Sequence, residues 1–276
     1  MIVDKEVARN VVKPSPSWIR ANSDRIYRWS SVATALILWQ LSGLFLKPIF
    51  ISTPSSVALS FAHLISDGKL PGAFLRSLLE MIGGLIAAGI VGIGVGLLMG
   101  RVRHIERALE PLVAFGNATP TIALLPVMEV WFGITTAARV AFIMVIATWP
   151  LLVNTVAGVK ATRSNFTDVG KAFGLNGWSQ TWKIYFPGTV PFIFVGIRIA
   201  LAVGAVGMVL GGQEIGSTGL GGLSVIFGGY SQTSDLVATI VSTTGLALIL
   251  FMLSRKAQDR YFPWIRDTSG GRRGSK

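Results

Sequence analysis

Long apolar runs, separated by shorter polar and often basic stretches, set the pattern of this chain. The runs fall near residues 29–46, 76–100, 108–132, 137–158, 189–210 and 236–254. A helix of about 17–25 apolar residues is long enough to cross the hydrocarbon core of a bilayer, and it satisfies its own backbone hydrogen bonds there. The pattern therefore predicts an all-α polytopic membrane protein with six transmembrane helices.

Composition agrees with this prediction and narrows the function classes. Hydrophobic residues make up 51% of the 276 residues and charged residues only 14%, whereas soluble domains carry about 25% charged residues. The absence of cysteine excludes disulfides, thiolate metal sites and cysteine nucleophiles. His63 and His104 fall on opposite sides of the membrane in the predicted topology, and no catalytic set or nucleotide-binding motif is evident. We therefore expect no enzyme, no metal site and no cofactor bound by this chain.

The basic residues predict the orientation of the chain in the membrane. Six spans put both termini on one side, together with residues 101–107 and 159–187. Residues 1–28, 101–107, 159–187 and 255–276 carry 6, 3, 4 and 7 of the 25 Lys and Arg residues. Because Lys and Arg concentrate in cytoplasmic loops, this side is predicted to be the cytoplasm. The net charge of +12 then faces membrane lipid, and no nucleic-acid partner is needed to explain it.

Three regions follow from this topology. They are a basic cytoplasmic N-terminal segment (1–28), a transmembrane domain (29–254) and a basic cytoplasmic C-terminal tail (255–276). The loop at 159–187 belongs to the second region and is its longest predicted cytoplasmic excursion.

The stretch from Asp168 to Pro191 is polar and basic although it joins two apolar runs. Asp168 is favourable in a first helical turn, and Gly174 suits a left-handed helix end. A second segment, Gly177 to Phe186, places aromatic residues at spacings that can share one helix face, and Pro187 is expected to end it. These aromatic residues are Trp178, Trp182, Tyr185 and Phe186. The pattern predicts two short helices outside the membrane, joined at a glycine, that present a rigid surface to a soluble partner.

This stretch resembles the ATPase-coupling loop of permease subunits in bacterial ABC importers. The usual pattern is Glu-Ala-Ala, three residues, Gly, and a spacer to a hydrophobic-Pro pair. Asp168, Val169 and Gly170 occupy the first three positions, and Gly174 keeps the spacing of the glycine. The resemblance favours the nitrate/sulfonate/taurine (bicarbonate) branch. The coupling residues that it implies are Asp168, Gly170, Ala172, Gly174, Trp178, Phe186 and Pro187.

The resemblance implies a type I ABC importer permease fold in the bacterial plasma membrane. It also implies three protein partners: cytoplasmic ABC ATPase subunits that use ATP and Mg, an extracytoplasmic solute-binding protein, and a second permease copy. The transported solute would belong to the nitrate, sulfonate, taurine or vitamin-precursor group. The alternative function is a secondary-active transporter that works without an ATPase. For the stretch from Asp168 to Pro191, the alternative is an ordinary basic cytoplasmic loop.

The third apolar run is interrupted by Pro111, Pro120 and Pro126, with Asn117 and Thr119 near its middle. Proline removes a helix hydrogen bond, and freed backbone at membrane depth is tolerated only inside protein or beside a water-filled cavity. A discontinuous helix is therefore a candidate for the substrate path. A kinked packing helix is the alternative.

Charged side chains in or beside the runs are further candidates for the substrate path: Glu80, Glu129, Arg198 and Glu214. An ionisable group in a bilayer is costly unless it is paired or wet. Relative to the branch that the chain resembles, Glu80 and Asn117 stand where arginine is common, and Glu129 where an aliphatic residue is usual. Such a path would repel anions and weakly favour a non-anionic heterocycle. Glu80 and Glu129 solvated near the outer surface, and Arg198 in a structural ion pair, are the alternatives.

Three packing features complete the prediction. Small residues recur every four positions in the second run, at 84, 88, 92, 96 and 100, and allow a neighbouring helix to approach closely. Residues 54–67 read as a proline-started amphipathic helix outside the membrane, with a plain connector as the alternative. Residues 211–235 form a Gly-rich outward loop that either approaches the pore or serves as a flexible connector.

Overall fold

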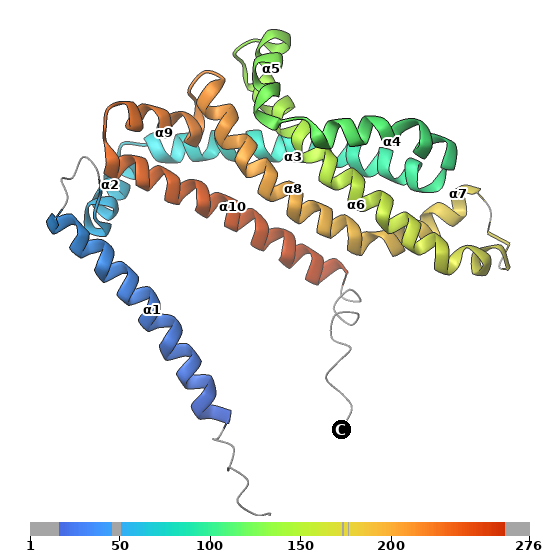
Figure 1. Ribbon diagram of the computed structural model, residues 1–276, viewed down its shortest axis with the longest axis horizontal. Helices are drawn as coiled ribbons and strands as arrows, with labels where there is room; N and C mark the ends of the chain where they lie inside the picture. The colour runs from blue at the N-terminus through green and yellow to red at the C-terminus, as the bar shows by residue number, and fades with distance from the viewer. Residues whose placement is uncertain (1–16, 46–50, 173, 176, 263–276) are drawn as a thin grey trace, which may run out of the picture.

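The computed structural model describes residues 17–45, 51–172, 174–175 and 177–262 (Figure 1). The elements in chain order are α1 (Ser17–Phe45), α2 (Pro54–Ser66), α3 (Lys69–Arg101), α4 (Arg103–Ala118), the 3₁₀ turn η2 (Thr121–Leu124), α5 (Leu125–Phe132), α6 (Thr136–Ala172), α7 (Gly177–Gln180), the π-helical turn η3 (Thr181–Tyr185), α8 (Phe186–Glu214), α9 (Gly219–Gly229) and α10 (Thr233–Tyr261). No strand occurs in these ranges, so the predicted all-α class is confirmed. Residues 1–16 and 263–276, which belong to the predicted terminal segments, lie outside the described residues.

Four helical stretches are long and apolar enough to cross a membrane. They are α3, residues 136–162 of α6, residues 181–214 of η3 and α8, and α10. The pair α4 and α5 adds a fifth crossing if the two helices form one broken span. α1 is not among them, although a span was predicted at 29–46, and residue 46 of that predicted span lies outside the described residues. The described part of the chain thus supports four or five of the six predicted spans.

The centre of the fold is the packing of α3, α6 and α8, which lie side by side along the long axis (Figure 1). A Cβ atom added to Gly96 of α3 would lie 2.7 Å from the Thr155 side chain of α6. Likewise, a Cβ added to Gly158 of α6 would lie 2.7 Å from the Thr189 side chain of α8. These positions have room only for hydrogen, which confirms the predicted close-packing face of the second apolar run.

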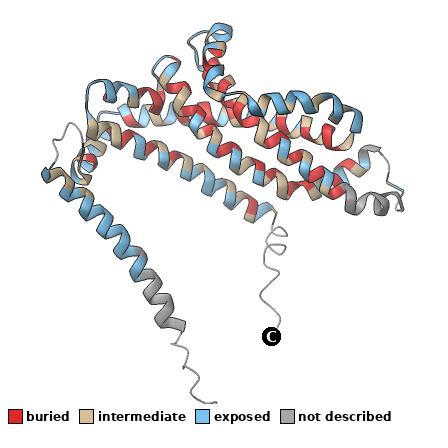
Figure 2. Cartoon of the chain, in the orientation of Figure 1, coloured by how far each residue is buried: buried red, intermediate tan, exposed pale blue. Residues whose placement is uncertain are grey.

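α1 leaves this bundle and projects away from it (Figure 1), and its described residues are mostly exposed (Figure 2). Its described hydrogen bonds to the rest of the fold lie near its C-terminal end. The Trp39 indole donates to the Ser52 carbonyl over 2.8 Å, and the Gln40 amide donates to the Ser55 hydroxyl over 3.0 Å. α1 therefore depends on the segment around α2 for its attachment.

The predicted helix at 54–67 is confirmed as α2. Pro54 lies in its first turn, where a missing N–H costs nothing. The N-cap is Thr53, whose hydroxyl accepts from the Ser56 N–H while the Ser56 hydroxyl accepts from the Thr53 N–H. This reciprocal capping box fixes the direction in which α2 starts.

The third apolar run breaks at one place and not at three. α4 ends at Ala118 and α5 leaves at a bend of 101°, so the interruption falls at Thr119 and Pro120. Pro111 lies inside α4 without ending it, and Pro126 lies in the first turn of α5. The prediction of a discontinuous helix is confirmed, but Pro111 and Pro126 do not interrupt it.

The Gly-rich stretch at 211–235 is not a flexible connector. α8 extends through Glu214, a short turn follows, and α9 packs back against α8, α3 and α10. Gly222 of α9 lies so close to the turn that an added Cβ would lie 2.0 Å from the Ser217 carbonyl carbon. These glycines allow two backbone segments to approach closely, and they do not make the stretch flexible.

Candidate functional site

The predicted coupling loop is the tip of a hairpin of long helices. α6 continues without a break to Ala172, so Asp168 and Gly170 lie in its last turns and not in a separate short helix. Gly174 follows with φ of +71°, the left-handed conformation predicted for it. The chain then returns through α7 beside the end of α6 (Figure 1). The side chains of residues 163–172, 177 and 178, including Asp168, Ala172 and Trp178, lie outside the described part of the structure.

The second half of this hairpin runs directly into the membrane helix. α7, η3 and α8 follow one another from Gly177 to Glu214, so the prediction that Pro187 ends a separate helix is wrong. Pro187 lies in the first turn of α8, where its missing N–H is tolerated. Trp182 is half exposed and its ring centroid lies 5.2 Å from that of Phe186, whereas Tyr185 is buried. The described aromatic side chains thus divide between the surface and the core.

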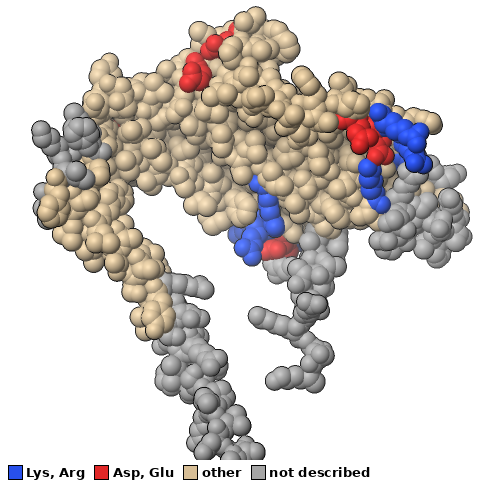
Figure 3. All heavy atoms as spheres, in the orientation of Figure 1, with Lys and Arg blue, Asp and Glu red and all other residues tan. Residues whose placement is uncertain are grey.

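Charge gathers in a few places on the face drawn in Figure 3. One cluster lies where α3 meets α4, a second near the C-terminal end of α10, and an acidic group near the ends of α5 and α8. At the first cluster, Lys160 of α6 forms an ion pair with Glu106 of α4. This contact ties α4 to α6 at the same end of the bundle as the hairpin tip.

Glu80 of α3 forms a buried ion pair with Arg139 of α6. The Arg139 Nε donates to Glu80 Oε1 over 2.8 Å, and the two side chains are 5% and 2% exposed. Arg139 also donates to the Ile215 carbonyl and to the Thr136 hydroxyl, each over 2.9 Å. The negative charge of Glu80 is therefore balanced inside the fold, and neither solvation near the outer surface nor an unbalanced pore charge describes it.

The same cluster fixes the turn between α8 and α9. The Leu220 N–H donates to the Ser77 hydroxyl of α3 over 2.9 Å. Together with the bond from Arg139 to Ile215, this holds both ends of the turn. Within the turn, Gly216 and Gly219 have φ of +82° and +64°, conformations that glycine adopts without strain. Two membrane helices therefore clamp one tight connection.

The remaining predicted path residues are dispersed over the fold. Asn117 and Thr119, beside Pro120 at the α4–α5 break, each donate to a carbonyl four residues earlier over 2.9 Å. Glu129 is half-buried on α5, and Glu214 is exposed in the last turn of α8. The structure brings neither of these acids to the Glu80 carboxylate, which is occupied by Arg139. That these residues line one path stays a prediction.

Arg198, the predicted basic residue within a span, packs against α10. One of its Nη atoms donates to the Gln258 side-chain carbonyl over 2.5 Å, and its buried Nε has no partner among the described residues. The partner is a neutral amide, so the structure does not show the ion pair considered for this arginine. A pore role for Arg198 stays a prediction.

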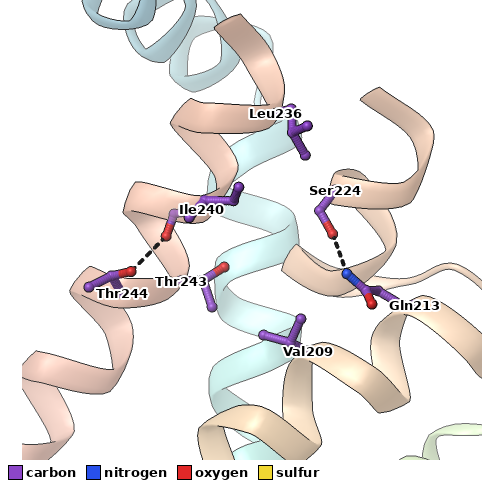
Figure 4. A pocket seen from close by; sticks show the side chains of 7 residues that line it. All are labelled: Val209, Gln213, Ser224, Leu236, Ile240, Thr243 and Thr244. Atoms are coloured by element: carbon purple, nitrogen blue, oxygen red, sulfur yellow. Dashed lines mark hydrogen bonds between the residues drawn. The ribbon is translucent and has the colours of Figure 1, made fainter. Parts of the chain in front are cut away.

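A pocket between α8, α9 and α10 was not predicted from the sequence (Figure 4). Its volume is about 230 Å³. The lining residues are Val209 and Gln213 of α8, Ser224 of α9, and Leu236, Ile240, Thr243 and Thr244 of α10. None of them is charged. The recurrence of Thr and Ser in the last apolar run was the only sign of it in the sequence.

Comparison with known proteins identifies the family. Residues 89–266 match the family described as "Binding-protein-dependent transport system inner membrane component". The chain belongs to this family. It is a family of inner-membrane transport components, not of enzymes, and the apolar helices agree with a multi-pass membrane protein.

Relatives of this binding-protein-dependent component carry different transport names. The bicarbonate transport system permease protein CmpB of Synechococcus elongatus is 26% identical, over 96% of this chain and 98% of its own length. The riboflavin transport system permease protein RibX of Chloroflexus aurantiacus is 30% identical, over 79% and 82%. Further relatives are named for aliphatic sulfonates, taurine and formylaminopyrimidine. The predicted branch of ABC importer permeases is therefore confirmed.

The fold also matches a solved structure. The MetNI methionine ABC transporter, in an inward-facing conformation, has a chain that aligns with a TM-score of 0.58 at 18% identity. The match covers 71% of this component and 95% of that chain. The predicted ABC permease fold is thereby confirmed.

Proposed function

We propose that this chain is the permease subunit of an ATP-driven ABC importer and forms the translocation path for a small solute. The family match carries the proposal, because the family is defined by transport that depends on a binding protein. The partners would be two cytoplasmic ATPase subunits using ATP and Mg, an extracytoplasmic solute-binding protein and a second permease copy. In this arrangement the hairpin tip around Gly174 contacts the ATPase on the cytoplasmic side, where both termini also lie.

The hairpin supports this role physically. A soluble motor can move a membrane domain only through a structure that protrudes and does not deform. α6 and the continuous stretch α7–η3–α8 protrude together, and close contacts such as Gly158 on Thr189 hold them to each other. The left-handed Gly174 closes the tip with no side chain of its own.

Co-purification tests the proposal. The tagged chain is extracted from its native membranes in mild detergent, and the accompanying proteins are identified by mass spectrometry. An ABC ATPase and a solute-binding protein are expected. If the chain purifies alone and still transports in liposomes without ATP, a secondary-active transporter becomes the better account.

The charge distribution supports a non-anionic solute. Arg139 balances Glu80, so the path candidates that lack a described ion pair are Glu129, Glu214 and Arg198. With Glu80 neutralised, two acidic residues and one basic residue remain as candidates for the path. They still disfavour an anionic solute, but less strongly than the sequence predicted when Glu80 was counted as a third acid. If Glu129 lines the path, Glu129→Gln changes the uptake of a cationic or neutral solute in reconstituted vesicles. Unchanged uptake would remove Glu129 from the path.

A further inference from the structure

The pocket of Figure 4 presents polar groups from two sides and apolar groups at its ends. Gln213 and Ser224 lie on one side, and the Thr243 side chain points toward them from α10 across the opening. Val209 and Leu236 lie toward the two ends. Hydrogen-bonding groups that face one another across an apolar slot are the arrangement of a small-molecule site.

The polar groups of the pocket are held in place yet keep unused capacity. The Gln213 amide donates to the Ser224 hydroxyl over 3.0 Å, and Ser224 donates onward to the Gly221 carbonyl over 2.6 Å. One N–H of Gln213 and its side-chain carbonyl oxygen have no partner among the described residues. Thr243 donates to the Thr239 carbonyl and keeps its acceptor capacity. The pocket can therefore offer both a donor and acceptors to a ligand.

The volume of the pocket and its lack of charged lining residues limit the kinds of ligand that it can bind. A volume of about 230 Å³ equals roughly eight water molecules at the density of the liquid, which suits a single ring better than a large molecule. No charged side chain lines the pocket, and moving an unpaired charge into such surroundings is costly. The apolar side chains of Val209, Leu236 and Ile240 can pack against a flat ring. An ion or a strongly charged solute would find no counter-charge there.

The pocket also lies beside the clamped turn. Gln213 is two residues before Ile215, whose carbonyl accepts from Arg139. The polar wall is therefore fixed by the same contacts that fix the turn between α8 and α9. In the proposed orientation this end of the bundle faces outward, the side from which a binding protein delivers solute.

We propose that the pocket between α8, α9 and α10 binds a small neutral ring compound that carries both a hydrogen-bond donor and an acceptor, such as an aminopyrimidine. Gln213 and Thr243 contact polar groups on opposite edges of the ring, and Val209 and Leu236 pack against its faces. This inference rests on the proposed importer function, of which it specifies the substrate class and a residence site.

Reconstituted transport tests the pocket. The complete complex, with its ATPase and binding protein, is placed in liposomes, and ATP-dependent uptake is measured for formylaminopyrimidine, taurine and bicarbonate. The variants are Gln213→Leu and Thr243→Val, which remove hydrogen-bonding groups at nearly constant volume. The matched control is Thr239→Val, which makes the same exchange one turn earlier on α10 at a fully buried position outside the pocket. Tm shifts of the purified complexes with each probe provide a second readout.

Wild type is expected to take up formylaminopyrimidine in preference to taurine, a zwitterion, and bicarbonate, an anion, because the pocket offers no counter-charge to either. Each pocket variant should lower that uptake about tenfold, the effect of one lost hydrogen bond of typical strength, and should lose the probe's Tm shift. Thr239→Val should retain both. Wild-type levels in both pocket variants would overturn the site. Preference for taurine or bicarbonate would overturn the substrate class but leave the importer standing, whereas ATP-independent uptake would instead overturn the importer function.

Discussion

Arg139 connects three segments that are far apart in the chain. It binds a carboxylate on α3, a hydroxyl at the start of its own helix and a main-chain carbonyl after α8. A buried ion pair is weak evidence for stability in itself, because desolvation offsets the attraction. Removing one partner is different, since it leaves a buried charge without compensation. The pair therefore acts as a constraint that must remain complete.

Replacing Glu80 by Gln should destabilise the protein because Arg139 loses its counter-charge. Breaking a buried pair typically costs about 3–5 kcal/mol, which lowers Tm on the order of 10 °C for a chain of this size. Thermal unfolding in detergent measures the change. Glu110→Gln is the control, because Glu110 is exposed on α4 and has no described ion pair. Equal Tm values for the two variants would contradict a constraint at Glu80.

Gly174 offers a second test at the residue scale. Nothing lies within 4 Å of an added Cβ, so its positive φ, and not crowding within this chain, restricts the position. Gly174→Val should reduce the coupling of ATP hydrolysis to transport because a β-branched residue disfavours this conformation. Gly174→Asn should retain it, since Asn tolerates the left-handed region.

Coupling is measured as solute transported per ATP hydrolysed in reconstituted vesicles. If both variants fail equally, the ATPase rejects any side chain at this position, and the backbone explanation is wrong. If both couple normally, the tip around Gly174 is not the contact with the ATPase.

The sequence predicted Gly174 but not the partner of Glu80, for a physical reason. A helix end is a local event, and a glycine near the end of a polar segment is enough to indicate it. The ion pair joins residues 59 positions apart, and only the packing of α3 on α6 brings them together. An acid within an apolar run still implied a basic partner, and Arg139, at the start of another run, was available in the sequence.

At the scale of elements, close helix contacts depend on glycine at particular positions. Gly96 faces Thr155 of α6, whereas Gly94 on the same helix has nothing within 4 Å of an added Cβ. Both positions are equally helical, so they share the same intrinsic preference for larger residues. A difference in stability between substitutions at Gly96 and at Gly94 therefore measures the effect of helix packing alone.

Gly96→Leu should force α3 away from α6 and lower the yield of folded protein. Overpacking a tight contact costs about 1–3 kcal/mol or more, and here a backbone carbonyl lies 3.1 Å from the added Cβ as well. Gly94→Leu should leave Tm unchanged or raise it, since it adds helix propensity on an open face. Size-exclusion profiles and Tm in detergent compare the two. A larger loss in Gly94→Leu would reverse the assignment of the packed face.

Prolines explain where element prediction succeeded and failed. Pro120 falls at a real break, with a bend of 101° beside it. Pro126 and Pro187 fall in first turns, where the lack of an N–H is harmless, and Pro111 is accommodated within α4. The sequence shows that a proline lacks the N–H for a helical hydrogen bond, but it does not show whether the helix uses an N–H at that position. Whether it does depends on where the helix starts, because first-turn N–H groups have no partner within the helix.

On the scale of the whole molecule, the number of crossings and their orientation are separate questions. The apolar pattern predicted six crossings, and the described helices support four or five. α1 is not among these helices, and its described residues are mostly exposed (Figure 2). The pair α4 and α5 accounts for the choice between four and five. The basic residues predict the orientation, which can be measured directly.

Single-cysteine labelling measures the orientation of the chain in the membrane, and the native chain has no cysteine that would interfere. Gln232→Cys, before α10, should react with a membrane-impermeant maleimide on spheroplasts. Lys183→Cys, in η3, should react only after the membrane is opened. Both positions are exposed, so accessibility within the protein does not separate them. The reverse pattern would place the hairpin tip outside and remove any contact with a cytoplasmic ATPase.

The uninterrupted course of the two hairpin helices has a mechanical consequence. α6 runs 37 residues from near Arg139 to the tip, and the stretch from Gly177 to Glu214 returns to Gln213. Each extends over 50 Å or so at the helical rise of about 1.5 Å per residue. Because α6 and α8 pack against each other, the two helices can move together as one rigid lever. If the tip contacts an ATPase as proposed, a push there would arrive at the opposite end as displacement rather than being absorbed as bending. Both the clamped turn and the pocket would then belong to the end that moves.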